Sequence, residues 1–79
     1  MNKNNENMKE YIEASQEELL FMRHHMPRGM VAMICHRTGA SRSRVLYQIM
    51  QMPENQDVKI IQATREIFEA VTQLKYEPK

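Results

Sequence analysis

The stretch MVAMICHRTGASRSRVLYQIM, residues 30–50, contains two apolar segments with a glycine and a serine between them. Its first segment predicts a short helix over residues 30–37. Gly39 ends that helix, because glycine readily adopts the left-handed backbone that closes many helices. Ser41 is then a favourable N-cap for another helix over residues 42–51. The stretch therefore predicts two short helices joined by a tight turn.

The apolar residues of both helices recur at helical spacing, which indicates one buried face on each helix. The side chains predicted to point inward are Val31, Ile34, Cys35, Val45, Leu46, Ile49 and Met50. On the second helix, the opposite and solvent-facing positions are Arg44, Tyr47, Gln48 and Gln51. The second helix thus presents a polar and basic surface near its beginning.

Another helix is predicted before this pair. Ser15 and Glu18 match a capping box at the start of a helix over residues 16–26. Pro27 closes that helix, because the residue before a proline is pushed out of helical geometry.

The last helix is predicted over residues 56–75, with Asn55 or Asp57 as its N-cap. Its expected core residues are Ile60, Ile61, Thr64, Ile67, Phe68, Val71 and Leu74. A second stripe at seven-residue spacing runs beside them and consists of Ile60, Ala63, Ile67, Ala70 and Leu74. Because this apolar arc is wider than a small core needs, we expect the second stripe to join two subunits of a homodimer.

The composition also favours a helical domain. The chain has 79 residues with 8 Met and no Trp, and flexible straight-chain residues favour helices over a tightly packed β-core. A chain of this length forms one small domain. We predict an all-α, four-helix bundle over residues 15–76, preceded by a flexible polar arm over residues 1–14. Within that arm the segment KEYIEA is ambiguous between strand and helix.

The charges are unevenly distributed, although the net charge is only +1. From Leu19 to Pro53 the sequence has no Asp or Glu, yet it has five Arg and three His. These residues are Arg23, His24, His25, Arg28, His36, Arg37, Arg42 and Arg44. Such a block indicates a surface for an anionic partner, most simply a phosphate backbone.

The window from Val31 to Met50 resembles the helix-turn-helix of bacterial repressors, particularly the lac-repressor-type headpiece and the lambda-repressor-like group. The residues that carry the resemblance are Ile34, Gly39, Ala40, Ser41 and Val45. The chain departs from the pattern at Cys35, where alanine is usual, and at Gln48, where an aliphatic residue is usual. The resemblance covers residues 28–74 and implies a transcriptional regulator that binds double-stranded DNA.

The same resemblance implies how the chain contacts DNA. The beginning of the second helix enters the major groove, where arginine is the commonest specific reader of guanine. The residues implied to read bases are Arg42, Ser43, Arg44 and Tyr47. Those implied to contact phosphates are Arg28, Ser41, Arg37 and Gln48. Arg44 stands where a capping box carries Glu, and such a conflict with the helix dipole is typical of a functional site.

Two other binding functions stay open. A helical interaction module, antitoxin-like or adaptor-like, would bind a protein through the basic face or through a Met-rich face. That second face would consist of Met26, Met30, Met33, Met50 and Met52. RNA binding is a third reading, for which the sequence offers few aromatic residues to stack on bases.

Other classes of function lack their sequence signals. No cofactor or metal ion is expected, because His24 and His25 point about 100° apart on a helix and no second Cys completes a zinc site. We do not expect an enzyme, since Cys35 has no evident base and no glycine loop can cradle a phosphate. No site for a small-molecule ligand is evident either. With one cysteine, no membrane span and no signal-peptide core, we expect a cytoplasmic protein.

Overall fold

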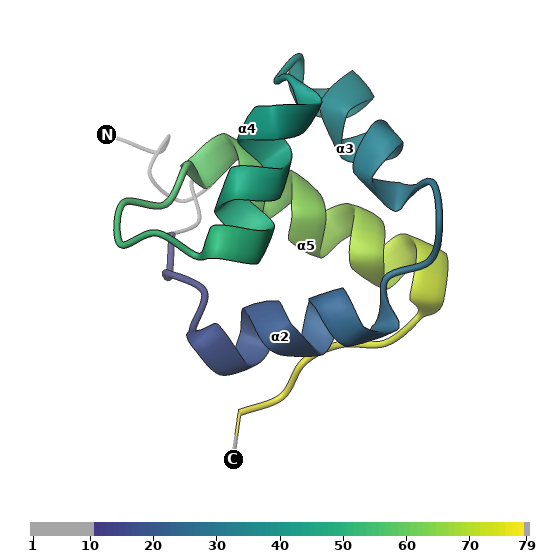
Figure 1. The fold of residues 1–79 in the computed structure, drawn as a ribbon. Coiled ribbons are helices and arrows are strands. Elements are labelled where there is room, and N and C mark those ends of the chain that lie inside the picture. The colour runs from purple at the N-terminus through teal and green to yellow at the C-terminus, as the bar shows by residue number, and fades with distance from the viewer. Residues whose placement is uncertain (1–10, 79) are drawn as a thin grey trace, which may run out of the picture.

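The residues that the structure describes, 11–78, form five helical segments (Figure 1). The structure is a computed structural model, and its elements are α2 (Gln16–His25), α3 (Met30–Thr38), α4 (Arg42–Leu46), the π-helical turn η1 (Tyr47–Gln51) and α5 (Val58–Thr72). Within residues 11–78 there is no β-strand, so the predicted all-α class is confirmed.

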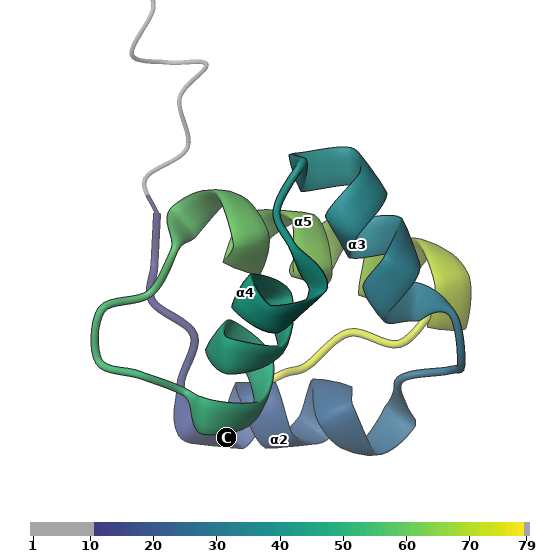
Figure 2. The same ribbon diagram turned by 45° about the horizontal axis from the view of Figure 1, so that its top comes forward.

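The helices pack around α5. α3 and α4 lie beside each other, and α5 runs behind both of them (Figures 1 and 2). η1 continues α4 directly, so residues 42–51 form one helical rod, as the sequence predicts. The far end of this rod contacts α2, which crosses the opposite side of the molecule. The beginning of α4 therefore lies next to the end of α3 and away from α2.

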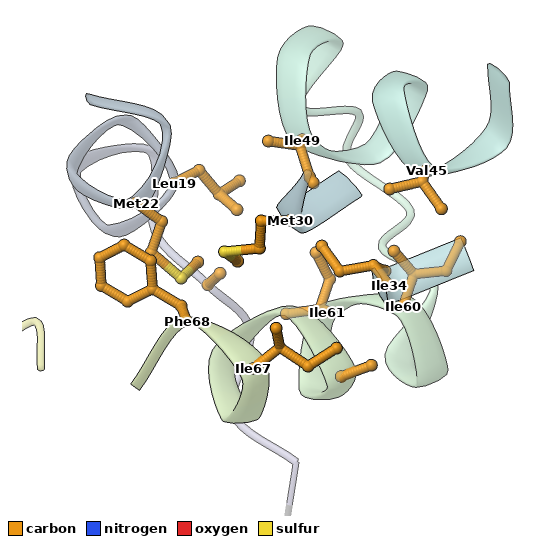
Figure 3. Packing of buried hydrophobic residues seen from close by; sticks show 12 residues of the cluster. Leu19, Met22, Met30, Ile34, Val45, Ile49, Ile60, Ile61, Ile67 and Phe68 are labelled. Carbon is orange, nitrogen blue, oxygen red and sulfur yellow. The ribbon is translucent and has the colours of Figure 1, made fainter. Parts of the chain in front are cut away.

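The core lies where α5 meets the other helices (Figure 3). Val45 and Ile49 point from the α4–η1 rod toward α5, while Leu19 and Met22 reach in from α2. The other buried apolar residues are Ala14, Met30, Ile34, Ile60, Ile61, Ala63, Ile67 and Phe68. Burial of a large aliphatic side chain contributes about 1.5–3 kcal/mol. The inner side of α4 is thus firmly anchored.

Three helices begin at the capping residues that the sequence indicates. The side-chain oxygens of Ser15, Ser41 and Asp57 accept the N–H groups of Glu18, Arg44 and Ile60, respectively. Glu18 does not complete the predicted capping box. Its carboxylate instead accepts two hydrogen bonds from Arg65 of α5, at 2.8 and 2.9 Å. This residue therefore joins α2 to α5.

α5 ends at Thr72, before the predicted residue 75. The Thr72 hydroxyl donates to the Phe68 carbonyl at 2.7 Å and accepts the Leu74 N–H at 3.1 Å. Gln73 then adopts a left-handed backbone with φ 62°. Val71 and Leu74, which the sequence pattern places in the core, are exposed.

Tyr11 and Ala14, within the predicted flexible arm, are held against the fold, whereas Ile12 and Glu13 between them are exposed. The Gln56 side chain donates to the Ala14 carbonyl at 2.8 Å and accepts the Ala14 N–H at 2.9 Å. Ala14 is buried, and the segment is neither helix nor strand. The Gln56 side-chain amide holds its backbone at Ala14, and no ladder of backbone hydrogen bonds between strands is involved. Residues 1–10 of the predicted arm lie outside the described residues.

Candidate functional site

The first turn of α4 projects its polar side chains into solvent. Gly39 ends α3 with φ 78° and donates its N–H to the Cys35 carbonyl at 2.8 Å. Val45 and Ile49 are fully buried and fix the inner side of the α4–η1 rod. The side chains left outside include the predicted DNA-contacting residues Ser41, Arg42, Ser43, Arg44 and Tyr47. The structure therefore gathers these five residues at one end of one helix.

These exposed residues leave the helix in different directions. Ser43 and Tyr47 are one turn apart and point away from the core, and Tyr47 is 52% exposed. Arg42 and Arg44 are two residues apart, which places their side chains about 200° apart around the helix axis. Within residues 11–78, Arg42 takes part in no ion pair, whereas Arg44 does. The two arginines are therefore not equivalent.

Arg44 is paired with Asp57, the residue that caps α5. Its Nη2 lies 2.7 Å from Asp57 Oδ2, and its Nε lies 3.3 Å from the same oxygen. Asp57 Oδ1 accepts the Ile60 N–H at 3.3 Å, so each carboxylate oxygen has its own task. The hydrogen bond from Arg44 lowers the pKa of Asp57 below its ordinary value, against the opposing effect of burial. Asp57 therefore stays ionised beside the basic helix.

Gln48 lies inside the fold, so the prediction that it contacts phosphate is wrong. It is only 6% exposed. Its Oε1 accepts the Asp57 N–H at 2.9 Å, and its Nε2 donates to the Asn55 carbonyl at 3.4 Å. Gln48 therefore holds the linker before α5 against the α4–η1 rod. The spacing of Val45, Gln48, Ile49 and Met52, i, i+3, i+4 and i+7, carries the signal for its burial.

Arg37 and Arg28 lie near opposite ends of α3. Arg37, near the C-terminal end, donates to Glu66 of α5 at 2.9 Å, in a pair whose two side chains are both more than half exposed. Arg28 is exposed in the turn before α3 and takes part in none of the ion pairs between residues 11 and 78. Two arginines of the acid-free stretch of sequence therefore have acidic neighbours in the fold, because Glu66 of α5 and Asp57, its N-cap, supply carboxylates.

Lys59 is a further cation that sequence reasoning did not select. A surface cavity of about 390 Å³ lies beside the α3–α4 turn, and Lys59 lines it together with Ser41, Arg44 and Asp57. Lys59 also lines a neighbouring cavity with Arg37 and Glu66. It stands in the first turn of α5 and has no recognisable motif around it. Only the packing of α5 against α3 and α4 reveals its place.

Three of the five residues predicted to form a dimer interface belong to the core. Ile60, Ala63 and Ile67 are buried beneath α3 and the α4–η1 rod, which excludes them from a subunit interface. Only Ala70 and Leu74 of that stripe are exposed. The arc appeared too wide for one core because α5 is covered from two sides. Ile60, Ala63 and Ile67 of the second stripe pack within the same chain.

The predicted Met-rich face is also divided. Met30 is buried, and Met26 and Met52 pack against the core. Met33 and Met50 are exposed, on α3 and η1 respectively. The five methionines therefore do not form one surface.

The histidines and the cysteine form no metal-binding group within residues 11–78, where no cluster of three His, Cys, Asp or Glu side chains is found. Cys35 is a free thiol that packs partly buried against the core. His25 Nδ1–H donates a hydrogen bond to the Phe21 carbonyl, 3.0 Å away, and its ring packs on the Phe21 ring. Cys35 and His25 therefore make their contacts within the fold.

Comparison with models of known families, with curated protein sequences and with solved structures finds no match to this chain. None of the helices between residues 11 and 78 has the length and apolar character needed to cross a lipid bilayer.

Proposed function

We propose that this chain is a DNA-binding transcriptional regulator in which α3 and α4 form a helix-turn-helix. The observation that carries the proposal is the exposed polar start of α4, with Arg42 outside any ion pair of the described residues and Tyr47 one turn beyond. A helix that is anchored on one side and polar at its beginning suits insertion into the major groove. The proposed base-reading residues are Arg42, Ser43, Arg44 and Tyr47, which leave this end of α4 in different directions.

Phosphate contacts complete the proposed interface. Arg28 precedes α3, Arg37 lies near its end, and Ser41 stands at the start of α4. Lys59 adds a cation beside the same turn. Basic side chains and N–H groups of this kind position a protein on the DNA backbone without reading sequence.

We also propose that the protein binds DNA as a homodimer, because two-fold symmetric regulators read two half-sites about one helical turn apart. The subunit contact must use residues outside the core. The exposed members of the predicted stripe are Ala70, on α5, and Leu74, just beyond its end. Sedimentation of the free protein at high micromolar concentration tests the dimer. A purely monomeric protein there would contradict it.

Selection of double-stranded DNA from a random pool by the purified chain tests the function directly. We expect a two-fold motif whose retention weakens with salt, with a log-log slope of about 0.9 for each neutralised phosphate. Arg42→Ala should remove about 1–3 kcal/mol of preference at one base pair. Arg28→Ala should weaken binding to all sequences about equally.

Lys75→Ala is the matched control, since it removes one positive charge from the C-terminal segment and leaves α3 and α4 intact. It should change neither the motif nor the affinity by more than the change in net charge explains. A wild-type protein that enriches no sequence would refute the proposal.

A second candidate function is binding of another protein, in the manner of an adaptor or antitoxin. One observation favours it: α2 and residues 76–78 line an open groove of about 910 Å³. Leu20, which is 48% exposed, Phe21 and Tyr76 give that groove apolar area. Leu20→Glu should then abolish partner binding while Arg42→Ala preserves it. The DNA-binding proposal predicts the opposite ranking for retention of DNA.

A further inference from the structure

The ion pair between Arg44 and Asp57 lies at the edge of the proposed DNA-reading surface. Arg44 belongs to the first turn of α4, and its side chain is 62% exposed. Asp57 belongs to the linker that leads into α5, and its side chain is only 20% exposed. One partner is thus directed outward, while the other is held against the protein.

Asp57 has little freedom to move. Its N–H donates to the buried Gln48 side chain at 2.9 Å, which ties its backbone to the same helical rod that carries Arg44. Its Oδ1 accepts the Ile60 N–H as the cap of α5. Oδ2 therefore has a fixed position, and a guanidinium that binds it is fixed as well.

The geometry of the pair leaves Arg44 able to bind a further acceptor. An arginine has five N–H donors in a planar fork. Asp57 Oδ2 takes the edge formed by Nε and Nη2, with distances of 3.3 and 2.7 Å. The end of the fork, with Nη1 and the second hydrogen of Nη2, forms no hydrogen bond with residues 11–78. That end can donate two parallel hydrogen bonds, as guanine O6 and N7 require.

We propose that Asp57 is a positioning residue that holds the Arg44 guanidinium in the orientation with which Arg44 reads a guanine. This inference rests on the proposed function. It adds that Arg44 reads guanine and that the specificity of Arg44 depends on Asp57. A preordered side chain loses less rotamer freedom on binding, so the fork discriminates more sharply between base pairs. The contribution of Asp57 is to sequence preference, since its own negative charge opposes general affinity for DNA.

Two isosteric variants of the full chain separate this role from a simple charge effect. Asp57→Asn removes the carboxylate and keeps a residue that caps helices well. Glu66→Gln removes the partner of Arg37 and changes the net charge by the same amount. Both variants should therefore gain the same small, sequence-independent increase in DNA affinity.

The measurement is the dissociation constant for the enriched DNA and for every single-base-pair substitution of it. With Asp57→Asn we expect preference for guanine to fall by about fivefold or more at one position. Arg44→Ala should lose preference at that same position, and adding Asp57→Asn to it should cause no further loss. Glu66→Gln should preserve preference at every position.

Unchanged preference in Asp57→Asn would overturn the inference while leaving DNA binding itself established. The same holds if Asp57→Asn tightens binding to all sequences far more than Glu66→Gln does, because Asp57 would then compete with DNA for Arg44. Enrichment of no motif by the wild-type protein would refute both the proposed function and this inference.

A measurement without DNA tests the positioning independently. In the free protein, ¹⁵N relaxation of arginine Nε groups should give Arg44 a markedly higher order parameter than Arg42, which forms no ion pair with residues 11–78. Asp57→Asn should lower the Arg44 value to that of Arg42, and Glu66→Gln should leave it unchanged. Equal mobility of Arg42 and Arg44 in the wild-type protein would contradict a fixed guanidinium.

Discussion

Two arginines of the basic stretch each form an ion pair, Arg37 with Glu66 of α5 and Arg44 with Asp57, the N-cap of α5. The two pairs differ in the contacts that hold their carboxylates. The Glu66 side chain is 69% exposed and has no hydrogen bond other than that with Arg37 among the described residues. Asp57 caps α5 and is tied by its backbone to Gln48. An exposed pair of flexible side chains gains little free energy, whereas an anchored carboxylate can fix its partner. The comparison shows that the contacts which hold the carboxylate decide whether an ion pair can fix the position of its arginine.

Of the changes that test this comparison, replacement of Gln48 should lower the free energy of unfolding most. Gln48→Leu leaves the Asp57 N–H without its acceptor, and we expect the free energy of unfolding to fall by about 1–3 kcal/mol. Urea denaturation measures the change. Gln51→Leu on the exposed side of the same helical turn is the matched control, with an expected change within about 0.5 kcal/mol. Equal effects of the two substitutions would refute the anchoring role of Gln48.

The pH dependence of the Asp57 pair should give an intermediate effect. Because the folded pKa of Asp57 lies below its ordinary value, its carboxylate stabilises the fold above that ordinary pKa. This stabilisation is lost as the pH falls through the lower, folded pKa. We expect Asp57→Asn to reduce the free energy of unfolding by about 1 kcal/mol or less at pH 7.

The difference from the wild type should persist down to about pH 5 and shrink below about pH 4, as Asp57 becomes protonated. Thermal unfolding of both proteins over this pH range measures it. A difference that stays constant down to pH 2 would show that the charge of Asp57 does not stabilise the fold.

Loss of the Arg37–Glu66 pair should have the smallest effect on the free energy of unfolding. Glu66→Gln should change the free energy of unfolding by about 0.3 kcal/mol or less, since both side chains are mostly solvated. Urea denaturation at low and high salt measures the change. A loss as large as that of Asp57→Asn would remove the distinction between the two pairs.

Much of the fold could be predicted from local sequence signals. The N-caps Ser15, Ser41 and Asp57, together with Gly39, mark helix ends by interactions that span only a few residues. These signals are local, so a sequence pattern contains them. The predicted end of α5 is wrong because an apolar residue such as Leu74 continues the helical pattern while Thr72 ends the helix.

The environment of the candidate site was harder to predict. Arg44 and Asp57 are 13 residues apart, and Arg37 and Glu66 are 29 apart. Such pairs form only because of the way α5 packs. The distribution of charges along the sequence does not reveal them. The prediction of a solvent-facing Gln48 is wrong for a related reason. A buried glutamine is favourable only because the linker supplies partners for its amide.

The dominance of α5 in the core also has a consequence for biosynthesis. Five of the twelve buried apolar residues, Ile60, Ile61, Ala63, Ile67 and Phe68, lie on this last helix (Figure 3). While the chain is being synthesised, α3 and α4 emerge before the surface that covers them. Their apolar sides therefore stay exposed until residue 68 has left the ribosome. The exposed polar start of α4 and the core that supports it are therefore completed together, once α5 is free to pack.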